Sequence, residues 1–138
     1  MKIKNILYLT IIISIIIVAC KPSKNTNLDS ISKLEKEIFA PNVKFDSVKV
    51  KLLISMYTDF ADRFPNDTCA SKYLFSASRL YVSIENYQQS IALLDKIITN
   101  YPNAKITPDC MFMKAYIYDD KIKDYKSALK YYNEFINK

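Results

Sequence analysis

Few residues of this sequence could take part in covalent or acid–base chemistry. The chain has 138 residues, with three Cys, no His and no Gly. Without His it lacks the commonest general base and the commonest metal ligand of proteins. Without Gly it lacks the glycine loops that cradle phosphate groups. The Ser and Cys side chains have no imidazole partner for nucleophilic catalysis, so we expect neither an enzyme nor a bound cofactor.

Three acidic residues near the C-terminus, Asp119, Asp120 and Asp124, could gather around a cation. A calcium loop of the known kind needs a Gly for its sharp turn and a distal Glu, and this stretch has neither. Asp124 precedes an apolar helical pattern, where its carboxylate can cap the first turn. We therefore expect no metal site and interpret these acids as turn residues with one capping role.

The thiol with the clearest chemical context is Cys20. It follows a short cationic start at residues 1–5 and an apolar stretch at residues 6–18. That stretch is shorter than the ~20 residues of a membrane-spanning helix, and it fits the core of a signal peptide. An uncleaved signal anchor and an ordinary signal peptide remain alternatives.

A small residue followed by Cys20 resembles the bacterial lipoprotein signal, although Ile17 and Val18 depart from its usual pattern. The resemblance implies removal of residues 1–19 and acylation of Cys20, and two or more acyl chains give stable attachment to a membrane. Lys21 stands where an Asp marks retention at the inner membrane in well-studied Gram-negative bacteria. The resemblance thus implies a lipid-anchored protein of the cell envelope, at the outer membrane and facing the periplasm.

The charge of the chain is mildly basic. Its net charge is +6, and removal of Lys2 and Lys4 with the signal would leave +4. Such a charge suits an anionic membrane surface or an acidic partner, and no motif predicts nucleic-acid binding. We expect Cys69 and Cys110 to be two buried thiols at non-equivalent positions, and their oxidation stays open.

Helical apolar spacing dominates the sequence after residue 45. It predicts helices over residues 46–64, 67–84, 86–100, 107–120 and 124–138. Thr107 is expected to cap its helix, with Pro at the first helical position. Residues 20–45 are expected to form the lipidated start and a flexible tether containing at most a short helix at 31–38. No strand pattern occurs after residue 19.

The tripeptide Phe64-Pro65-Asn66 recurs 37 residues later as Tyr101-Pro102-Asn103, within a recurring helical pattern. A period in the mid-thirties predicts stacked helical hairpins. The second copy is one residue longer, between Tyr118 and Asp124.

The recurring residues resemble the tetratricopeptide repeat. The two full copies contribute Leu74, Ser78, Tyr81, Asn86, Tyr87, Ser90, Leu94, Ile97 and Pro102, then Met111, Ala115, Tyr118, Asp124, Tyr125, Ala128, Tyr132 and Phe135. The resemblance covers residues 46–138 and implies an all-α helical-hairpin solenoid of about two and a half repeats. Together with the lipoprotein signal it is similar to the tetratricopeptide lipoproteins of bacterial envelopes, such as the outer-membrane barrel-assembly lipoprotein and the Tol-Pal-associated coordinator.

In that family the first helices of the hairpins line a groove that takes peptides. The corresponding positions here are Lys72, Phe75, Arg79, Val82, Asp109, Phe112, Tyr116 and Asp119. The aromatic side chains would be anchors for a partner, and the cations would face a carboxylate. The alternative is that the aromatics are core residues and the charges form a solvated surface.

Our first functional hypothesis is a membrane-anchored scaffold for protein–protein interaction, with a role in outer-membrane or envelope assembly. The alternative is a self-associating structural lipoprotein. In the predicted register a third Tyr-Pro-Asn would begin near position 139, so the last helix is expected to expose Tyr132, Phe135 and Ile136. Those residues would pair with another copy of the chain, giving a homo-oligomer.

Overall fold

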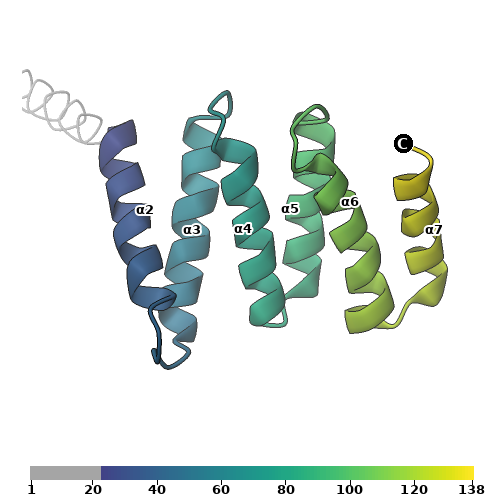
Figure 1. Ribbon diagram of the computed structural model, residues 1–138, viewed down its shortest axis with the longest axis horizontal. Coiled ribbons are helices and arrows are strands. Elements are labelled where there is room, and N and C mark those ends of the chain that lie inside the picture. Colours follow the sequence, from purple (N-terminus) through teal and green to yellow (C-terminus); the bar gives the residue numbers. More distant parts are fainter. Residues whose placement is uncertain (1–22) are drawn as a thin grey trace, which may run out of the picture.

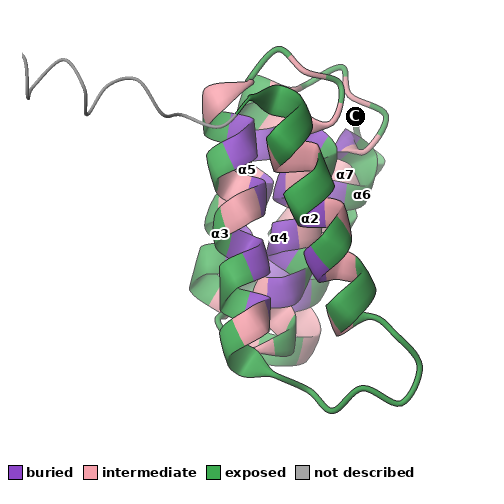
Figure 2. Ribbon diagram, turned by 90° about the vertical axis from the view of Figure 1, so that its left-hand side faces the viewer, coloured by how far each residue is buried: buried purple, intermediate pink, exposed green. Residues whose placement is uncertain are grey.

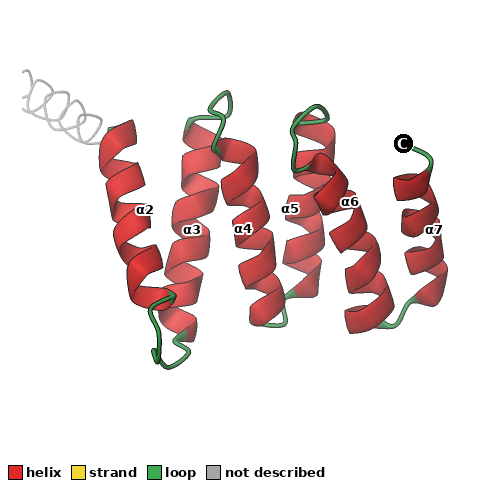
Figure 3. Ribbon diagram, in the orientation of Figure 1, coloured by secondary structure: helices red, strands yellow, loops and turns green. Residues whose placement is uncertain are grey.

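The computed structural model describes residues 23–138, which contain six α-helices, one π-helical segment and no strand (Figure 1, Figure 3). Their bounds are α2 Lys24–Ile38, α3 Ser47–Arg63, α4 Ala70–Ser83, α5 Tyr87–Asn100, α6 Thr107–Tyr116, η1 Ile117–Ile122 (the π-helical segment) and α7 Tyr125–Ile136. The helices stand side by side in chain order and alternate in direction, with α3 and α5 behind α2, α4 and α6 in Figure 1. The predicted all-α solenoid of helical hairpins is confirmed.

The second helix of each hairpin begins at a side chain that caps it. Oδ1 of Asp46 accepts from the backbone N–H groups of Val48 at 2.9 Å and Lys49 at 3.1 Å. Asn86 and Asp124 each accept from the N–H three residues later, at 3.4 and 3.1 Å. These caps satisfy amide groups that have no partner inside the helix. The cap at Asp124 is confirmed as predicted, because the capping contact is local in sequence.

The turn within each of the last two hairpins uses a non-glycine residue in the left-handed conformation. Glu85 has φ 58° and Lys123 has φ 61°. The amide after Glu85 donates to the carbonyl of Tyr81 at 2.8 Å, and the amide after Lys123 donates to that of Tyr118 at 2.9 Å. The second closure spans one residue more, and the chain accommodates it in the wider π-helical turn of η1. The extra residue seen in the sequence therefore has a defined place.

The turns between hairpins contain the recurring Pro-Asn sequence. Both have the same pattern of backbone hydrogen bonds. The amide of Asp67 donates to the carbonyl of Phe64, and that of Ala104 to the carbonyl of Tyr101, each at 3.0 Å. Thr107 was predicted to cap α6. It is instead the first residue of the helix. Its hydroxyl donates to the carbonyl of Tyr101 at 2.6 Å and so ties the helix start to the preceding turn.

Two apolar cores run through the stack, and each joins neighbouring hairpins. The first lies among α2, α3 and α4 and consists of Ile31, Leu34, Val50, Leu53, Ile54, Tyr57, Phe60, Ala77 and Leu80. The second joins the end of α3 to α4, α5, α6 and η1 and consists of Ala61, Ala70, Leu74, Ile91, Leu94, Ile97, Cys110 and Ile117. Each large side chain removed from water contributes ~1.5–3 kcal/mol. Separating two hairpins would expose several of them at once.

The short helix expected at residues 31–38 is present, but the predicted flexible tether is wrong over residues 24–30, because α2 already begins at Lys24. The hydroxyl oxygen of Ser23 accepts from the amide of Thr26 at 3.3 Å and caps the helix. Ile31 is 1% exposed and Leu34 is 8% exposed, both against α3. The first hairpin is therefore complete, and the stack has three hairpins rather than two and a half.

The signal segment and Cys20 lie outside the described residues. Among the helices from residue 23 onward, none combines the length and the apolar character needed to cross a membrane.

Replacement of Ile31 by Ala tests whether α2 belongs to the folded domain. We expect the free energy of unfolding to fall by ~2–4 kcal/mol, because the substitution leaves a cavity beneath α3. Lys33→Ala, on the exposed side of the same helix, should change it by less than ~0.5 kcal/mol. Chemical denaturation followed by circular dichroism measures both. If both substitutions leave the free energy of unfolding nearly unchanged, α2 is not part of the folded domain.

Candidate functional site

A groove of about 780 Å³ lies between α2 and α4, where the first and second hairpins meet. It is lined by Glu35, Lys36, Phe39, Ala40, Pro41, Tyr57, Ser76, Arg79 and Leu80. These residues come from α2 and the loop after it, from α3 and from α4. The groove therefore exists only because the hairpins stack.

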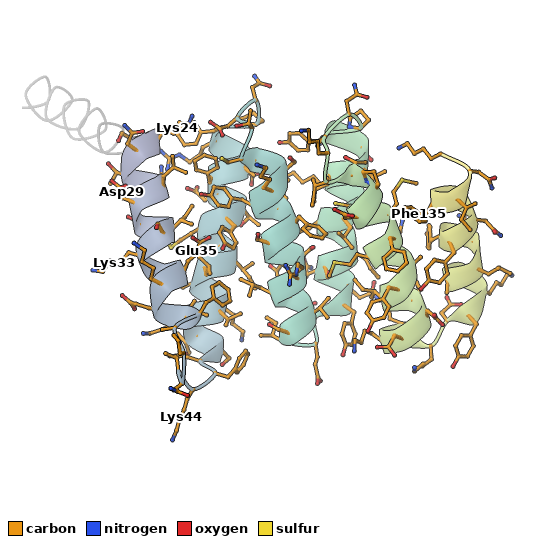
Figure 4. The ribbon with its side chains drawn as sticks, viewed as in Figure 1. Lys24, Asp29, Lys33, Glu35, Lys44 and Phe135 are labelled. Atoms are coloured by element: carbon orange, nitrogen blue, oxygen red, sulfur yellow. The ribbon has the colours of Figure 1, made fainter. Side chains whose placement is uncertain are left out.

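A buried tyrosine forms the floor of this groove. Tyr57 is 2% exposed, its hydroxyl donates to Oε1 of Glu35 at 2.5 Å, and its ring stacks on Tyr73 at 5.0 Å between centroids. Burial, and then the hydrogen bond to Glu35, raises the pKa of the Tyr57 hydroxyl above its usual value. Figure 4 shows Glu35 reaching from α2 toward α3. The floor is thus a fixed aromatic surface whose carboxylate neighbour is already engaged.

The rim of the groove is cationic. Lys36 and Arg79 are exposed, and neither forms an ion pair with any residue between 23 and 138. The nearby acids have partners, since Glu35 binds Tyr57 and Glu37 pairs with Lys49 at 3.1 Å. A guanidinium without a carboxylate partner can make two parallel hydrogen bonds to a carboxylate that enters the groove.

A smaller apolar pocket of about 280 Å³ continues from the groove around the end of α4. The groove and the pocket share Phe39 and Leu80, and the loop between α2 and α3 supplies Val43 and Phe45. Phe39, Val43 and Phe45 are 61%, 47% and 66% exposed, in a loop that Figure 2 shows exposed throughout. Adjacent exposed apolar side chains of this kind mark contact surfaces.

The predicted groove residues of α4 are placed apart from one another. Only Arg79 lines the groove between α2 and α4. Lys72 lies at a separate cleft of about 830 Å³ beside the turns between hairpins. Phe75 and Val82 are partly buried against the second core, as in the alternative interpretation of their role.

Three of the predicted groove residues in α6 and η1, Phe112, Tyr116 and Asp119, lie beside α7 instead. The ring of Phe112 contacts those of Tyr132 and Phe135, each at 5.8 Å between centroids. The hydroxyl of Tyr132 also donates to Asp119 at 3.4 Å. Phe112 and Tyr116 remain 49% and 39% exposed. The structure thus brings two sets that the sequence treated separately onto one surface of the third hairpin.

The acids near η1 are engaged by neighbouring side chains. Asp120 pairs with Lys121 at 2.8 Å and accepts from the Tyr116 hydroxyl at 2.9 Å, and these contacts lower the pKa of Asp120 to about 2. Asp124 caps α7 through Ser127. The chain from residue 23 contains no group of three or more His, Cys, Asp or Glu side chains placed to hold a metal ion.

No pattern in the sequence indicates that Lys114 is buried. It is 9% exposed, its Nζ lies 2.6 Å from Oδ1 of Asp95 and 3.8 Å from the centre of the Tyr131 ring. Burial lowers the pKa of Lys114, but the hydrogen bond and charge of Asp95 outweigh it and raise the pKa. Lys114 therefore links α5, α6 and α7 as a structural residue.

Glu35 and Phe39 were missed as site residues because residues 20–45 were assigned to a tether, and Tyr57 was missed because the groove above it forms only when α2 packs on α3. A signal was present, since Leu28 precedes Ile31 at the spacing of one helical turn.

The two cysteines of the described chain are free thiols in different surroundings. Cys110 is fully buried, and burial raises the pKa of its thiol to about 12. Cys69 is only partly buried, so the expectation of two buried thiols is wrong for it. It is the residue before α4, beside the turn between hairpins, and packs at the edge of the first core.

Comparison with known proteins gives one family. A model of the tetratricopeptide repeat matches residues 73–104 and 109–138. Neither the curated proteins nor the solved structures contain a match.

Thiol labelling tests the two environments. At pH 8 the native protein should react with a maleimide at Cys69, whereas Cys110 should react at least ~100-fold more slowly, because it is buried and remains a neutral thiol. Mass spectrometry of the labelled peptides measures both rates, and denatured protein is the control in which both react. Comparable rates in the native state would contradict this description of α6.

Proposed function

Because a tetratricopeptide-repeat model matches residues 73–104 and 109–138, and repeats of this kind commonly bind other proteins, we propose that this chain is a lipid-anchored interaction scaffold of the bacterial cell envelope. Its partner is a protein or peptide, held without any chemical step. The observation that supports this most is the groove between α2 and α4, which is preformed and combines an aromatic floor with a cationic rim. The cellular role we propose is envelope or outer-membrane assembly.

The groove and its pocket suggest how the partner binds. A large apolar side chain of the partner would fill the pocket at Phe39 and Leu80, where burial gives the main attraction. A carboxylate of the same segment would lie against Arg79, which forms no ion pair with a described residue and whose neighbour Glu35 already accepts a hydrogen bond from Tyr57. The floor at Tyr57 needs no rearrangement, so little conformational entropy is lost on binding.

The lipid anchor we propose is Cys20, as the lipoprotein-like signal implies. Only three residues separate Cys20 from the first residue of α2, Lys24. At ~3.3–3.6 Å per residue, the lipid-bearing residue lies at most ~14 Å from the helix. The domain would therefore be held close to the membrane, without the long tether first expected.

With so short a connection, the proposed anchor would also set which end of the domain faces the lipid. Lys24 forms an ion pair with Asp67, so the start of α2 lies at the turn between the first two hairpins. The loop that carries Phe39 and Phe45 lies at the opposite end of α2 (Figure 1), and Lys44 is at its tip in Figure 4. The apolar pocket would then open away from the membrane, toward the periplasm.

Photo-crosslinking in cells tests the groove. A photoreactive residue at Ser76, within the groove, should give one discrete protein adduct, whereas one at the exposed Thr99 of α5 should not. Arg79→Glu should reduce the Ser76 adduct at least ~10-fold, since a charged hydrogen bond is worth ~1.5–3 kcal/mol. Lys51→Glu makes the same charge change outside the groove and should leave the adduct intact. Equal loss with both variants would contradict the assignment.

Replacement of Cys20 by Ser tests the anchor. The variant should move from the membrane fraction to the soluble fraction, because no acyl chains are attached. Cys69→Ser removes a thiol elsewhere and should leave the protein in the membrane fraction. Retention of the Cys20→Ser protein would instead support an uncleaved signal anchor.

A further inference from the structure

The third hairpin exposes a face that the second hairpin keeps covered. Ile91 on α5 is 6% exposed, whereas Leu129, its equivalent on α7, is 64% exposed. Leu94 is 0% exposed, whereas its equivalent Tyr132 is only partly buried. α7 has a single buried residue, Ala128. The same repeat positions thus lie in a core in one hairpin and on the surface in the next.

The internal repeat shows what kind of element fits such a face. In the second hairpin, α5 is covered by α6 and η1. Cys110 and Ile117 of these elements are 0% exposed in the core that they share with α5, and Met113, which lies between them in the sequence, packs against the same core. Together with Ile106, which packs against the same core, these residues have the spacing i, i+4, i+7, i+11. The face of the third hairpin is therefore shaped for a helix with one apolar stripe of that spacing.

α7 itself has a stripe with this spacing. Tyr125, Leu129, Tyr132 and Ile136 follow one another at four, three and four residues. Three of them are 64%, 64% and 74% exposed, and nothing between residues 23 and 138 covers them. The spacing is that of the a and d positions of a helix pair. From this we infer that α7 and the adjoining face of α6 bind the same face of a second copy of this chain.

The aromatic residues beside the stripe would widen the contact. Phe112 on α6 packs against Tyr132 and Phe135 and is still 49% exposed. Phe135 lies on the side of α7 toward α6 (Figure 4). Aromatic side chains at the centre of a pairing surface supply much of its attraction.

Charge and the other end of the stack favour a symmetric pair over a head-to-tail chain. The stripe contains no acid, and the only acid of α7, Glu134, lies 3.9 Å from Lys130 on the same helix. At the opposite end, the outer surface of α2 is polar and includes Asp29 and Lys33 (Figure 4). An apolar face would be poorly covered by such a surface, so the face pairs with its own copy.

The direction of pairing rests on the lipid anchor proposed at Cys20. Two copies held close to one membrane by the same end must place their α7 helices parallel, with Leu129 opposite Leu129 and Ile136 opposite Ile136. A parallel two-stranded pair with apolar residues at this spacing is a stable arrangement.

The test uses the full-length chain expressed in one cell with two different affinity tags. After extraction in mild detergent, each tag should recover the other. Leu129→Glu should reduce this recovery at least ten-fold, whereas Leu52→Glu should not. Leu52 is the matched control, because it is a helical Leu that is 54% exposed on α3, away from the face. Circular dichroism should show unchanged helicity for both variants.

Three results would overturn the inference. They are no recovery of the second tag with the unmodified chain, equal loss with both Leu variants, or recovery of a different protein in place of the second copy. Ile136→Cys in a Cys69→Ser background should give an oxidised dimer in membranes, and its absence despite recovery would refute the parallel arrangement. Cys20→Ser should release the chain yet preserve recovery, which separates this inference from the anchor.

Discussion

Each hairpin of this protein has an apolar face that only a neighbouring hairpin covers. Tyr57 and Phe60 of the first hairpin become core residues because Tyr73 of the second lies 5.0 Å from each ring. Leu94 of the second is buried because Cys110 of the third packs into the same core. Stability in such a stack is a sum of interfaces between neighbours. An apolar face is exposed wherever no neighbouring hairpin packs against it.

The two surfaces to which we assign function are both consequences of this constraint. The groove at Arg79 lies where α2 and α4 meet without filling the space between them. The face at Leu129 lies where the stacking order has no further described helix to bury it. One surface is polar at its rim and concave, and the other is apolar and built on one helix stripe. They therefore suit different partners, a protein segment with a carboxylate and a second copy of the chain.

The repeat also tolerates local change without losing its interfaces. The third hairpin contains one residue more than the second, yet the closing hydrogen bond at Tyr118 and the cap at Asp124 are kept. The π-helical turn of η1 takes up the difference, and Ile117 at its start is still fully buried. A residue added at the edge of a hairpin thus leaves the core pattern intact.

Local features of the fold were predictable from the sequence, and the composition of the site was not. The caps at Asn86 and Asp124 and the turns at Pro65 and Pro102 are satisfied within a few residues, so the sequence encodes them directly. The apolar period similarly encodes α3 through α7. Only residues 31–38 of α2 were anticipated, and its first half was missed because its apolar stripe is short and its exposed side is very polar.

Hydrogen bonds and apolar spacing along one helix are local, so the order of amino acids is enough to specify a repeat of helices and the turns that join them. Which exposed side chains share a surface depends on how the helices pack. Arg79 meets Glu35 and Phe39 only because α2 packs on α3, and Phe112 meets Tyr132 rather than Arg79 because α6 turns that side toward α7. Such contacts depend on how helices far apart in sequence pack together, and no spacing along the chain specifies them.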